Sequence, residues 1–462
     1  MSKNKGNRGL IAVASVLGVL AVALVILIIV MIAVPGLFNG RGREEASSGE
    51  SSRQESELSP GSQTSEETSS EASSETSSES QESSDEASQG GSSGTEEGSS
   101  EEGSSDTDES SEESPQQGTD EAYEAAREAL VEELLSQMTL EEKVGQMIMA
   151  RFPGPSSGAY YAEEYQLGGY VFFDVDFSGY SEDTVRERID GCQAVSNIPM
   201  LMAVDEEGGT VTRVSDYYRD YRFRAPRYIF EDGGWDAIEA DTREKCELLL
   251  RLHLNMNLAP VADIAGDPYD FMYDRSFGTD LDATCEFIRM TVEIMNEYGV
   301  ACSLKHFPGY GNNEDTHTGM AIDYRDAETF YNEDFLPFIA GIEAGAGTIM
   351  VSHNVVTCFD PEYPASLSPE LHELARYLGF EGVLMTDDLA MGAIQEYCGE
   401  NSAAVLAVLA GNDMLIADDF TGVIESILSA VDDGMITEER IDESVRRILR
   451  LKIDMGLIEL PQ

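Results

Sequence analysis

The chain has 462 residues, and its 88 acidic and 29 basic side chains give a formal charge of −59. This acidity argues against nucleic acids and anionic lipid surfaces as partners, because both repel a strongly negative protein. Six cysteines are widely scattered without the spacing of a metal site, and we expect them to be free, buried thiols.

Residues 10–38 are almost wholly apolar and follow a short basic segment, 1–9. The run from Leu10 to Val34 has 25 residues without a charge, and as a helix it would span about 37 Å, more than the ~30 Å hydrocarbon core of a bilayer. Three basic residues before the run and two after it favour a cytoplasmic N-terminus. We therefore expect a single-pass protein of the cell membrane with its globular part outside. A cleaved signal peptide is the alternative.

Residues 44–120 are mainly Ser, Glu, Gly, Gln and Thr, with 23 acidic side chains and one large aliphatic residue, Leu58. Such a segment cannot bury enough apolar surface to offset the conformational entropy lost on folding, so we expect a disordered linker. An ordinary globular composition returns after it. Residues 121–462 are numerous enough to form one large domain.

Helix and strand signals alternate through residues 121–462. A first helix is predicted over 121–137, and Thr139 and Glu142 form a capping box that opens the next one. Further helices are predicted over 281–298, 327–344, 400–410 and 437–455. Short apolar runs bounded by Gly, Pro, Asn or Asp predict strands at 146–152, 169–173, 200–205, 257–262, 301–306, 348–353, 383–388 and 413–417.

Continuous apolar strands that alternate with helices are typical of a parallel sheet buried on both faces. Eight of them suit an α/β fold of the (β/α)8 TIM-barrel type, and a doubly wound open sheet is the alternative. In a barrel, polar residues at the carboxyl ends of strands face the active site. Six polar residues fall at predicted strand ends: Asp205, Asp263, Lys305, His306, His353 and Asp387.

The most informative motif is LKHFPGYGNNEDTHTGMAID, residues 304–323. A strand ends at Lys305 and His306, and a loop rich in Gly and Asn follows that carries Asp315 and His317. Such a loop can bring a proton donor to a substrate and withdraw it. Asp315 can hold the imidazole of His317 in one tautomer and raise its basicity. A lone histidine in a loop is usually an exposed residue without a function. This chain has only five histidines, however, and three of them lie at strand ends or in this loop.

A second motif, GVLMTDDLAMGAI at residues 382–394, ends a buried strand in Thr386, Asp387 and Asp388. A carboxylate at this place can attack an anomeric carbon or stabilise an oxocarbenium-like transition state. An aspartate pair could equally bind a metal or cap a helix. The spacing alone does not distinguish Asp387 from Asp388.

Two further motifs carry groups suited to binding hydroxyls. AVDEEGGTVTRV, residues 203–214, ends a strand at Asp205 and continues to Arg213. YDRSFGTD, residues 273–280, places Arg275 in another loop. Aspartate can accept hydrogen bonds from vicinal sugar hydroxyls, and arginine can hold a hydroxyl or a carboxylate. A structural ion pair is the alternative for each arginine.

Eight motifs in order resemble those of glycoside hydrolase family 3, and specifically its bacterial β-N-acetylhexosaminidase branch. The resemblance covers residues 125–460, and the KHFPG motif with its DxH pair is its most specific part. The remaining motifs are SQMTLEEKVGQM (136–147), LGGYVFF (167–173), MNLAPVADI (256–264) and AGNDMLIA (410–417).

The resemblance implies that Asp387 is the nucleophile, because the family's nucleophile follows Ser or Thr at its strand end. It implies that His317, paired with Asp315, is the general acid/base. The implied activity is that of a retaining exo-β-N-acetylglucosaminidase, which forms a covalent glycosyl-enzyme and needs no metal or organic cofactor. An outward-facing enzyme of this kind would meet peptidoglycan fragments or other exposed glycans. The implied sugar-binding residues are Asp205, Arg213, Arg275, Lys305 and His306.

The chain departs from the family pattern in two places. Tyr310 stands where many members have His, and we expect altered loop packing there rather than lost activity. Many members continue into a second α/β domain, which supplies the acid/base in some branches, and we expect the dyad in the loop to take that role here. The rival functions are a phosphorylase, a β-glucosidase without acetamido selectivity, and a non-catalytic wall-binding protein. The last would be expected to have lost Asp387, Asp315 or His317.

Overall fold

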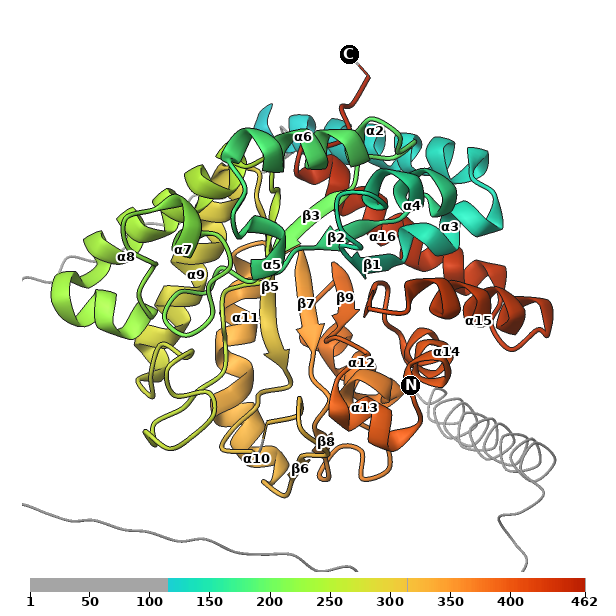
Figure 1. Cartoon of the computed structure of the whole chain (residues 1–462). Helices are drawn as coiled ribbons and strands as arrows, with labels where there is room; N and C mark the ends of the chain where they lie inside the picture. The colour runs from blue at the N-terminus through green and yellow to red at the C-terminus, as the bar shows by residue number, and fades with distance from the viewer. Residues whose placement is uncertain (1–114, 314, 462) are drawn as a thin grey trace, which may run out of the picture. The chain divides into compact units, whose positions relative to one another are not determined.

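The computed structural model describes residues 115–313 and 315–461 (Figure 1). The predicted N-terminal segment 1–9, membrane anchor 10–38 and all but the end of the linker 44–120 lie outside these ranges and stay predictions. Among the described residues, no helix combines the length and the apolar character that a membrane crossing requires.

Eight parallel strands form one sheet in the order β10-β1-β2-β3-β4-β5-β7-β9. Each of them overlaps one of the apolar runs in the sequence, and nearly all of their residues are buried, as expected for a sheet covered on both faces. The strands are β1 (Ile148–Arg151), β2 (Gly169–Val171), β3 (Leu201–Val204), β4 (Met256–Asn257), β5 (Ala301–Phe307), β7 (Thr348–Val351), β9 (Val383–Thr386) and β10 (Leu415–Ala417), and a separate small sheet pairs β6 (Ile322–Asp323) with β8 (Val355–Val356).

The sheet curls into a nearly closed barrel. β1 is first in the chain, yet it pairs in parallel with both β2 and the last strand, β10. β9 and the residue before β10 meet through a parallel bridge between Met385 and Met414, and Thr386 N donates to Met414 O at 3.1 Å. The two ends of the strand order are therefore neighbours. This excludes the doubly wound alternative and confirms the predicted barrel in its nearly closed form.

Helices follow the strands and surround the barrel (Figure 1). The predicted capping box is present, because Thr139 N donates to Glu142 Oε2 at 2.9 Å and Glu142 N donates to Thr139 Oγ1 at 3.3 Å. The helices are α2 (Pro115–Gln137), α3 (Leu140–Gln146), α4 (Gly158–Tyr165), α5 (Asp174–Phe177), α6 (Glu182–Gln193), α7 (Ser215–Tyr218), α8 (Pro226–Arg251), α9 (Leu281–Glu297), α10 (Ala327–Thr329), α11 (Phe335–Glu343), α12 (Pro369–Tyr377), α13 (Gly392–Tyr397), α14 (Glu400–Ala410), α15 (Phe420–Asp432) and α16 (Glu438–Asp454).

The helix predicted over 327–344 is interrupted. A π-helical turn, η1 (Phe330–Asp334), separates α10 from α11. Within this turn Asp334 is buried and pairs with Arg325 at 2.9 Å, so the wider turn delivers a carboxylate to an interior guanidinium. A short 3-10 turn, η2 (Ala365–Leu367), precedes α12.

All six cysteines lie in the described ranges and are free thiols, as expected. The expectation that they are buried is only partly right. A large core leaves room for thiols to fill gaps, but it does not require every thiol to be inside. Cys192, Cys246 and Cys302 are buried, Cys285 and Cys398 are half-buried, and Cys358 is exposed.

Candidate active site

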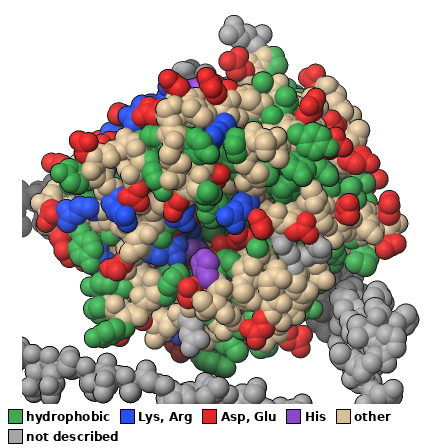
Figure 2. All heavy atoms as spheres, viewed as in Figure 1, with side chains coloured by type: hydrophobic (Ala, Val, Ile, Leu, Met, Phe, Trp, Pro, Cys, Tyr) green, Lys and Arg blue, Asp and Glu red, His purple; other side chains and the backbone are tan. Residues whose placement is uncertain are grey.

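The predicted site residues come together at the carboxyl ends of the strands. Asp205 follows β3, Lys305 and His306 lie in β5, and Asp387 follows β9. Parallel strands of a barrel all end at the same mouth, so these side chains converge. Figure 2 shows a histidine side chain in a hollow on this view of the surface, beside basic and acidic groups.

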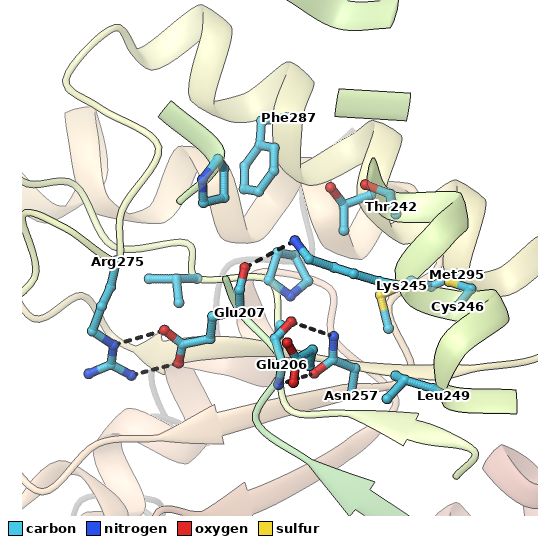
Figure 3. Close-up of a pocket in the computed structure, with 15 residues that line it drawn as sticks. Glu206, Glu207, Thr242, Lys245, Cys246, Leu249, Asn257, Arg275, Phe287 and Met295 are labelled. Carbon is cyan, nitrogen blue, oxygen red and sulfur yellow. Dashed lines mark hydrogen bonds and ion pairs between the residues drawn. The ribbon is translucent and has the colours of Figure 1, made fainter. Parts of the chain in front are cut away.

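Lys305 links two carboxylates at the floor of the site. Its Nζ lies 2.6 Å from Asp205 Oδ1 and 2.7 Å from Glu207 Oε1. Arg275 binds the same Glu207 through Nε at 2.9 Å and Nη2 at 2.8 Å (Figure 3). Burial alone would raise the pKa of Glu207, but the charges of Arg275 and Lys305 outweigh burial and lower it. Buried Glu207, Lys305 and Arg275 therefore form an ion-pair cluster, which the partly buried Asp205 extends through Lys305.

Glu207 and Arg275 also line a small cavity on the side of the cluster that faces α8 and α9 (Figure 3). Lys245 Nζ donates to the main-chain oxygen of Glu207 there, at 3.1 Å. Much of the remaining lining is apolar, including Leu249 and Phe287. This chemistry suits side-chain packing more than the binding of a sugar, whose hydroxyls need polar partners.

His306 is fixed by a carboxylate and a guanidinium. Its Nδ1 lies 2.7 Å from Asp263 Oδ2, which also accepts from His306 N at 3.0 Å. Arg275 Nη2 lies 3.2 Å from His306 Nε2. These contacts suit the tautomer with its proton on Nδ1, which donates to Asp263 while Nε2 accepts from Arg275. Arg275 is thus tied to two protein groups, and its predicted contact with substrate stays a prediction.

Arg213 lies beside Asp205 with space between the two groups. Its Nη2 is 3.9 Å from Asp205 Oδ2, beyond hydrogen-bond length. Its Nε is buried, makes no hydrogen bond within the described ranges and lies 3.8 Å from Asp174 Oδ1, in an ion pair. Glu206 holds the main chain here, since its Oε2 accepts from Arg213 N at 2.7 Å and from Val214 N at 2.8 Å. The positioned guanidinium and the nearby carboxylate can together bind vicinal hydroxyls.

Asp387 stands at the end of β9 with a half-buried carboxylate. Its main-chain N–H donates to Val351 O at 3.0 Å, and its Oδ1 accepts from Asp388 N at 2.8 Å. Burial alone would raise the pKa of Asp387, but the imidazoles of His353 and His306, the Asp388 N–H and His317 outweigh burial and lower it. The carboxylate is therefore ionised at neutral pH, as a nucleophile must be.

The neighbouring Asp388 is oriented differently. Its Oδ1 accepts from Ala390 N at 2.9 Å and so closes a turn. The carbonyl of Asp388 lies 3.0 Å from Nε2 of the buried His353, whose Nδ1 lies 2.7 Å from Ser366 Oγ. Burial lowers the pKa of His353, and its Nε2 is placed to donate to that carbonyl. His353 therefore orders the turn that carries Asp387.

The predicted dyad is formed. His317 Nδ1 lies 2.6 Å from Asp315 Oδ1, which also accepts from His317 N at 3.0 Å. With Nδ1 held by the carboxylate, Nε2 is the nitrogen left to exchange a proton with a ligand. The imidazole is 59% exposed, and its ring centroid lies 6.2 Å from that of Phe271. Gly392 N, five residues after Asp387, donates to His317 O at 3.3 Å, so the loop with the dyad is bound to the segment that follows Asp387.

Four residues that organise the site have no role assigned by the sequence pattern: Glu207, Asp263, His353 and Tyr310. Asp263 and His353 stand at predicted strand ends, and Tyr310 differs from the family pattern. The sequence therefore offers a reason to examine each of these three residues. Glu207 is the least predictable, because it is one of three successive acids in Asp205–Glu207. Only the path of the loop decides which of them meets Arg275.

The sequence profile described as the glycosyl hydrolase family 3 N-terminal domain matches residues 139–451. A β-hexosaminidase of Xanthomonas oryzae pv. oryzae is 34% identical over 237 residues, which are 49% of this chain and 69% of that protein. A β-hexosaminidase of Xylella fastidiosa is 32% identical over 267 residues, 54% of this chain and 76% of that protein.

The structure resembles that of a family 3 β-N-acetylglucosaminidase from a Paenibacillus species, with a TM-score of 0.65 and 30% identity. The match covers 70% of this chain and 65% of the Paenibacillus chain. The barrel and the motif residues described above lie within the region that the family profile matches.

Proposed function

Because this chain belongs to glycosyl hydrolase family 3, we propose that it is a retaining exo-β-N-acetylglucosaminidase that removes terminal N-acetylglucosamine from a glycan. The observation that carries the proposal is the pairing of an ionised carboxylate with a tethered imidazole at one mouth of the barrel. Asp387 has a lowered pKa, and His317 is held by Asp315. The β-hexosaminidase relatives support the choice of an acetamido sugar.

The ion-pair cluster is the proposed sugar-binding floor. Asp205 and Lys305 present a carboxylate and an ammonium 2.6 Å apart. Arg213 adds a guanidinium whose Nε makes no hydrogen bond within the described ranges. His306 contributes an imidazole fixed by Asp263. Hydroxyls can donate to carboxylates and accept from cations, so a hexose suits this set of groups.

The proposed reaction has two steps. His317 donates its Nε2 proton to the glycosidic oxygen while Asp387 attacks the anomeric carbon, so the C–O bond to the leaving group breaks as an ester bond to Asp387 forms. A water molecule then attacks the anomeric carbon and gives its proton to His317. The ester bond breaks, and the sugar leaves with retained configuration. An imidazole in this role avoids the charge repulsion that a second carboxylate would feel beside Asp387.

The nucleophile is tested by replacing Asp387 with Asn in the full-length chain. We expect turnover of an aryl N-acetyl-β-glucosaminide to fall by about 10⁴-fold or more, because the amide cannot form the glycosyl ester. Asp388→Asn is the matched control, and its loss should stay within about tenfold, because Asp388 closes a turn. Near-normal turnover by Asp387→Asn would refute the assignment.

The same assay separates the proposed function from its two catalytic rivals. We expect free N-acetylglucosamine as the product both with and without inorganic phosphate, whereas a phosphorylase would release the sugar 1-phosphate. We also expect the aryl N-acetylglucosaminide to be cleaved faster than the corresponding aryl glucoside. Equal rates on the two sugars would point to a β-glucosidase.

We further propose that the enzyme is held at the cell membrane with its catalytic part outside, where peptidoglycan fragments are the available substrates. The support is the uncharged run within 10–38, its basic N-terminal flank and the acidic segment 44–120. Fractionation of intact cells tests this: the activity should sediment with membranes, and external protease should release it. Activity found only in the soluble cell interior would contradict it.

A further inference from the structure

The loop that carries the dyad combines the partly exposed Asp315 and the exposed His317 with a buried residue between them. The side chains of Asp315 and His317 are 31% and 59% exposed, whereas Thr316 is completely buried. A proton donor must stay within hydrogen-bond reach of the oxygen that it protonates. An exposed imidazole cannot hold that position by its own packing, so whatever fixes Thr316 also places His317.

The hydroxyl of Tyr310 holds Thr316 from one side. Thr316 N donates to Tyr310 Oη at 2.8 Å, and Tyr310 Oη lies 2.7 Å from Thr316 Oγ1. Tyr310 is itself buried, and its main-chain N–H donates to Asp263 Oδ1 at 2.6 Å. Burial raises the pKa of Tyr310 to about 12, so the phenol keeps its proton at neutral pH. Asp263 thereby connects the dyad loop to His306 in the sugar-binding floor.

The start of α13 holds the same loop from the other side. Ala393 N donates to Thr316 O at 3.1 Å, and Gly392 N donates to His317 O at 3.3 Å. A Cβ atom at Gly392 would lie only 2.7 Å from His317 O, so glycine permits this approach. α13 begins five residues after Asp387. The segment that follows the nucleophile is therefore bound to the loop that carries the proton donor.

We propose that Tyr310 is a positioning residue, whose hydroxyl sets the place of His317 relative to Asp387 by holding Thr316. This inference rests on the proposed function, since it assigns Tyr310 a task in proton transfer. A phenylalanine would keep the ring packing against Phe271 and His306, whose ring centroids lie 5.7 and 5.6 Å away. It would leave the buried Thr316 N–H without an acceptor, which favours displacement of the loop.

The proposal predicts a loss that depends on the leaving group. Phenoxide leaves slowly unless the glycosidic oxygen is protonated, whereas 2,4-dinitrophenoxide leaves without a proton. The value of kcat/KM reports only the steps up to departure of the leaving group, so it isolates acid catalysis from the later attack of water. Sugar binding involves other residues, so the KM should change little.

The experiment compares Tyr310→Phe with Tyr170→Phe in the full-length chain. Tyr170 is also buried, and its hydroxyl donates to Gly158 O at 2.8 Å, so the control removes a buried hydrogen bond that does not involve the dyad loop. For Tyr310→Phe we expect kcat/KM to fall about 10- to 100-fold on the phenyl N-acetyl-β-glucosaminide and less than about threefold on the dinitrophenyl substrate. Tyr170→Phe should change both substrates equally.

Two further variants make each outcome decisive. Gly392→Ala keeps every side chain of the site and pushes on His317 O, so it should show the same selective loss as Tyr310→Phe. His317→Ala is the reference for complete loss of the proton donor. If His317→Ala affects both substrates equally, the proposed function is wrong in its acid/base residue. If His317→Ala shows the selective loss while Tyr310→Phe and Gly392→Ala do not, only the positioning role is overturned.

Discussion

Among single residues, Asp387 and Glu207 owe their ionised state to their immediate neighbours. Asp387 would have a raised pKa if burial acted alone, and the surrounding histidines and a main-chain N–H reverse the shift. Glu207 is more deeply buried, and it stays ionised because Arg275 and Lys305 both contact it. The site is thus prepared before any substrate arrives, which is what electrostatic preorganisation requires.

Replacement of Glu207 by Gln tests the ion-pair cluster. The change removes the negative charge shared by Arg275 and Lys305, so two buried cations lose the one carboxylate that contacts both of them. We expect the free energy of unfolding to fall by about 3–5 kcal/mol and kcat/KM to fall at least about tenfold, because Lys305 loses one of the two groups that orient it. Urea denaturation and steady-state kinetics measure the two effects.

The control for that change is Glu293→Gln. Glu293 makes an exposed ion pair with Arg289 at 2.7 Å on α9. Its loss should alter the free energy of unfolding by less than about 0.5 kcal/mol and leave kinetics unchanged. Equal stability losses in the two variants would contradict a special role for the buried cluster.

The sequence predicts the residue types of the site better than their partners. Asp205, Lys305 and His306 are placed correctly at strand ends, because an apolar run followed by a polar group marks the mouth of a barrel. The roles of Glu207 and Asp263 escape prediction, since their partners Arg275 and His306 come from other loops. Contacts between loops depend on the three-dimensional path of each loop, which no local pattern encodes.

At the scale of elements, the strands are the most predictable part of the fold. Each is a short apolar run with turn residues at its ends. Such a run is typical of a strand that is buried on both faces of a parallel sheet. The helix at 327–344 is predicted less well. Its pattern is helical throughout, and only the pairing of Asp334 with Arg325 accompanies the π-helical turn that divides it. A tertiary ion pair of this kind lies outside local propensity.

Asp413 lies just before β10, at the end of the strands opposite to the site, and it joins three elements there. Its Oδ2 accepts from Arg376 of α12 at 2.7 Å and from Leu384 N of β9 at 3.0 Å. Its Oδ1 accepts from Arg447 of α16 at 3.0 Å and from Ser444 at 2.9 Å. One buried carboxylate thus helps to bring β9, β10 and two helices together where the barrel is closed by a single bridge.

We expect Asp413→Asn to lower the free energy of unfolding by about 3 kcal/mol, because the partly buried arginines lose their common counter-charge. The kinetics of the folded enzyme should not change, since Asp413 lies at the end of the strands opposite to the site. Asp433→Asn, at an exposed position after α15, is the matched control and should be neutral. Denaturant unfolding and kinetics below the melting transition check both statements. A fall in kcat/KM without loss of stability would contradict them.

At the scale of the whole molecule, α16 completes the core with an unusual residue. Its apolar stripe includes Ile441, Val445 and Ile448, and Lys452 continues the same stripe at helical spacing. Lys452 is fully buried, and its Nζ donates to Gln146 Oε1 at 2.7 Å. Burial lowers its pKa from 10.5 to about 7. The helical spacing explains why Lys452 faces the core, and the structure shows Gln146 as its partner there.

This lysine makes the stability of the molecule depend on pH. Between about pH 7 and pH 10.5 the unfolded chain binds a proton at Lys452 that the folded chain does not, so stability rises with pH in this window. Below about pH 7 Lys452 is protonated in both the folded and the unfolded chain, and the folded chain bears the full free-energy cost of a buried ammonium ion. Lys452→Met should therefore be more stable than the unchanged protein at low pH, and this advantage should shrink as the pH rises.

The stability advantage of Lys452→Met, measured as the difference in the free energy of unfolding, should fall by about 2 kcal/mol between about pH 6 and about pH 8.5. Each pH unit above the folded pKa contributes about 1.4 kcal/mol to this fall. Urea denaturation of both proteins at each pH measures it, and the difference between them cancels every other titrating group. A difference that stays constant across this range would show that Lys452 does not titrate there.

The assignment of Asp387 as nucleophile is tested most directly by trapping the glycosyl-enzyme in the full-length protein. A 5-fluorinated N-acetylglucosaminyl fluoride slows both steps but carries a good leaving group, so the covalent ester should accumulate. We expect the intact mass to increase by one sugar unit and the modified peptide to carry the sugar on Asp387. A protein that hydrolyses the unfluorinated substrate but carries the label on another residue, or never acquires one, would contradict it.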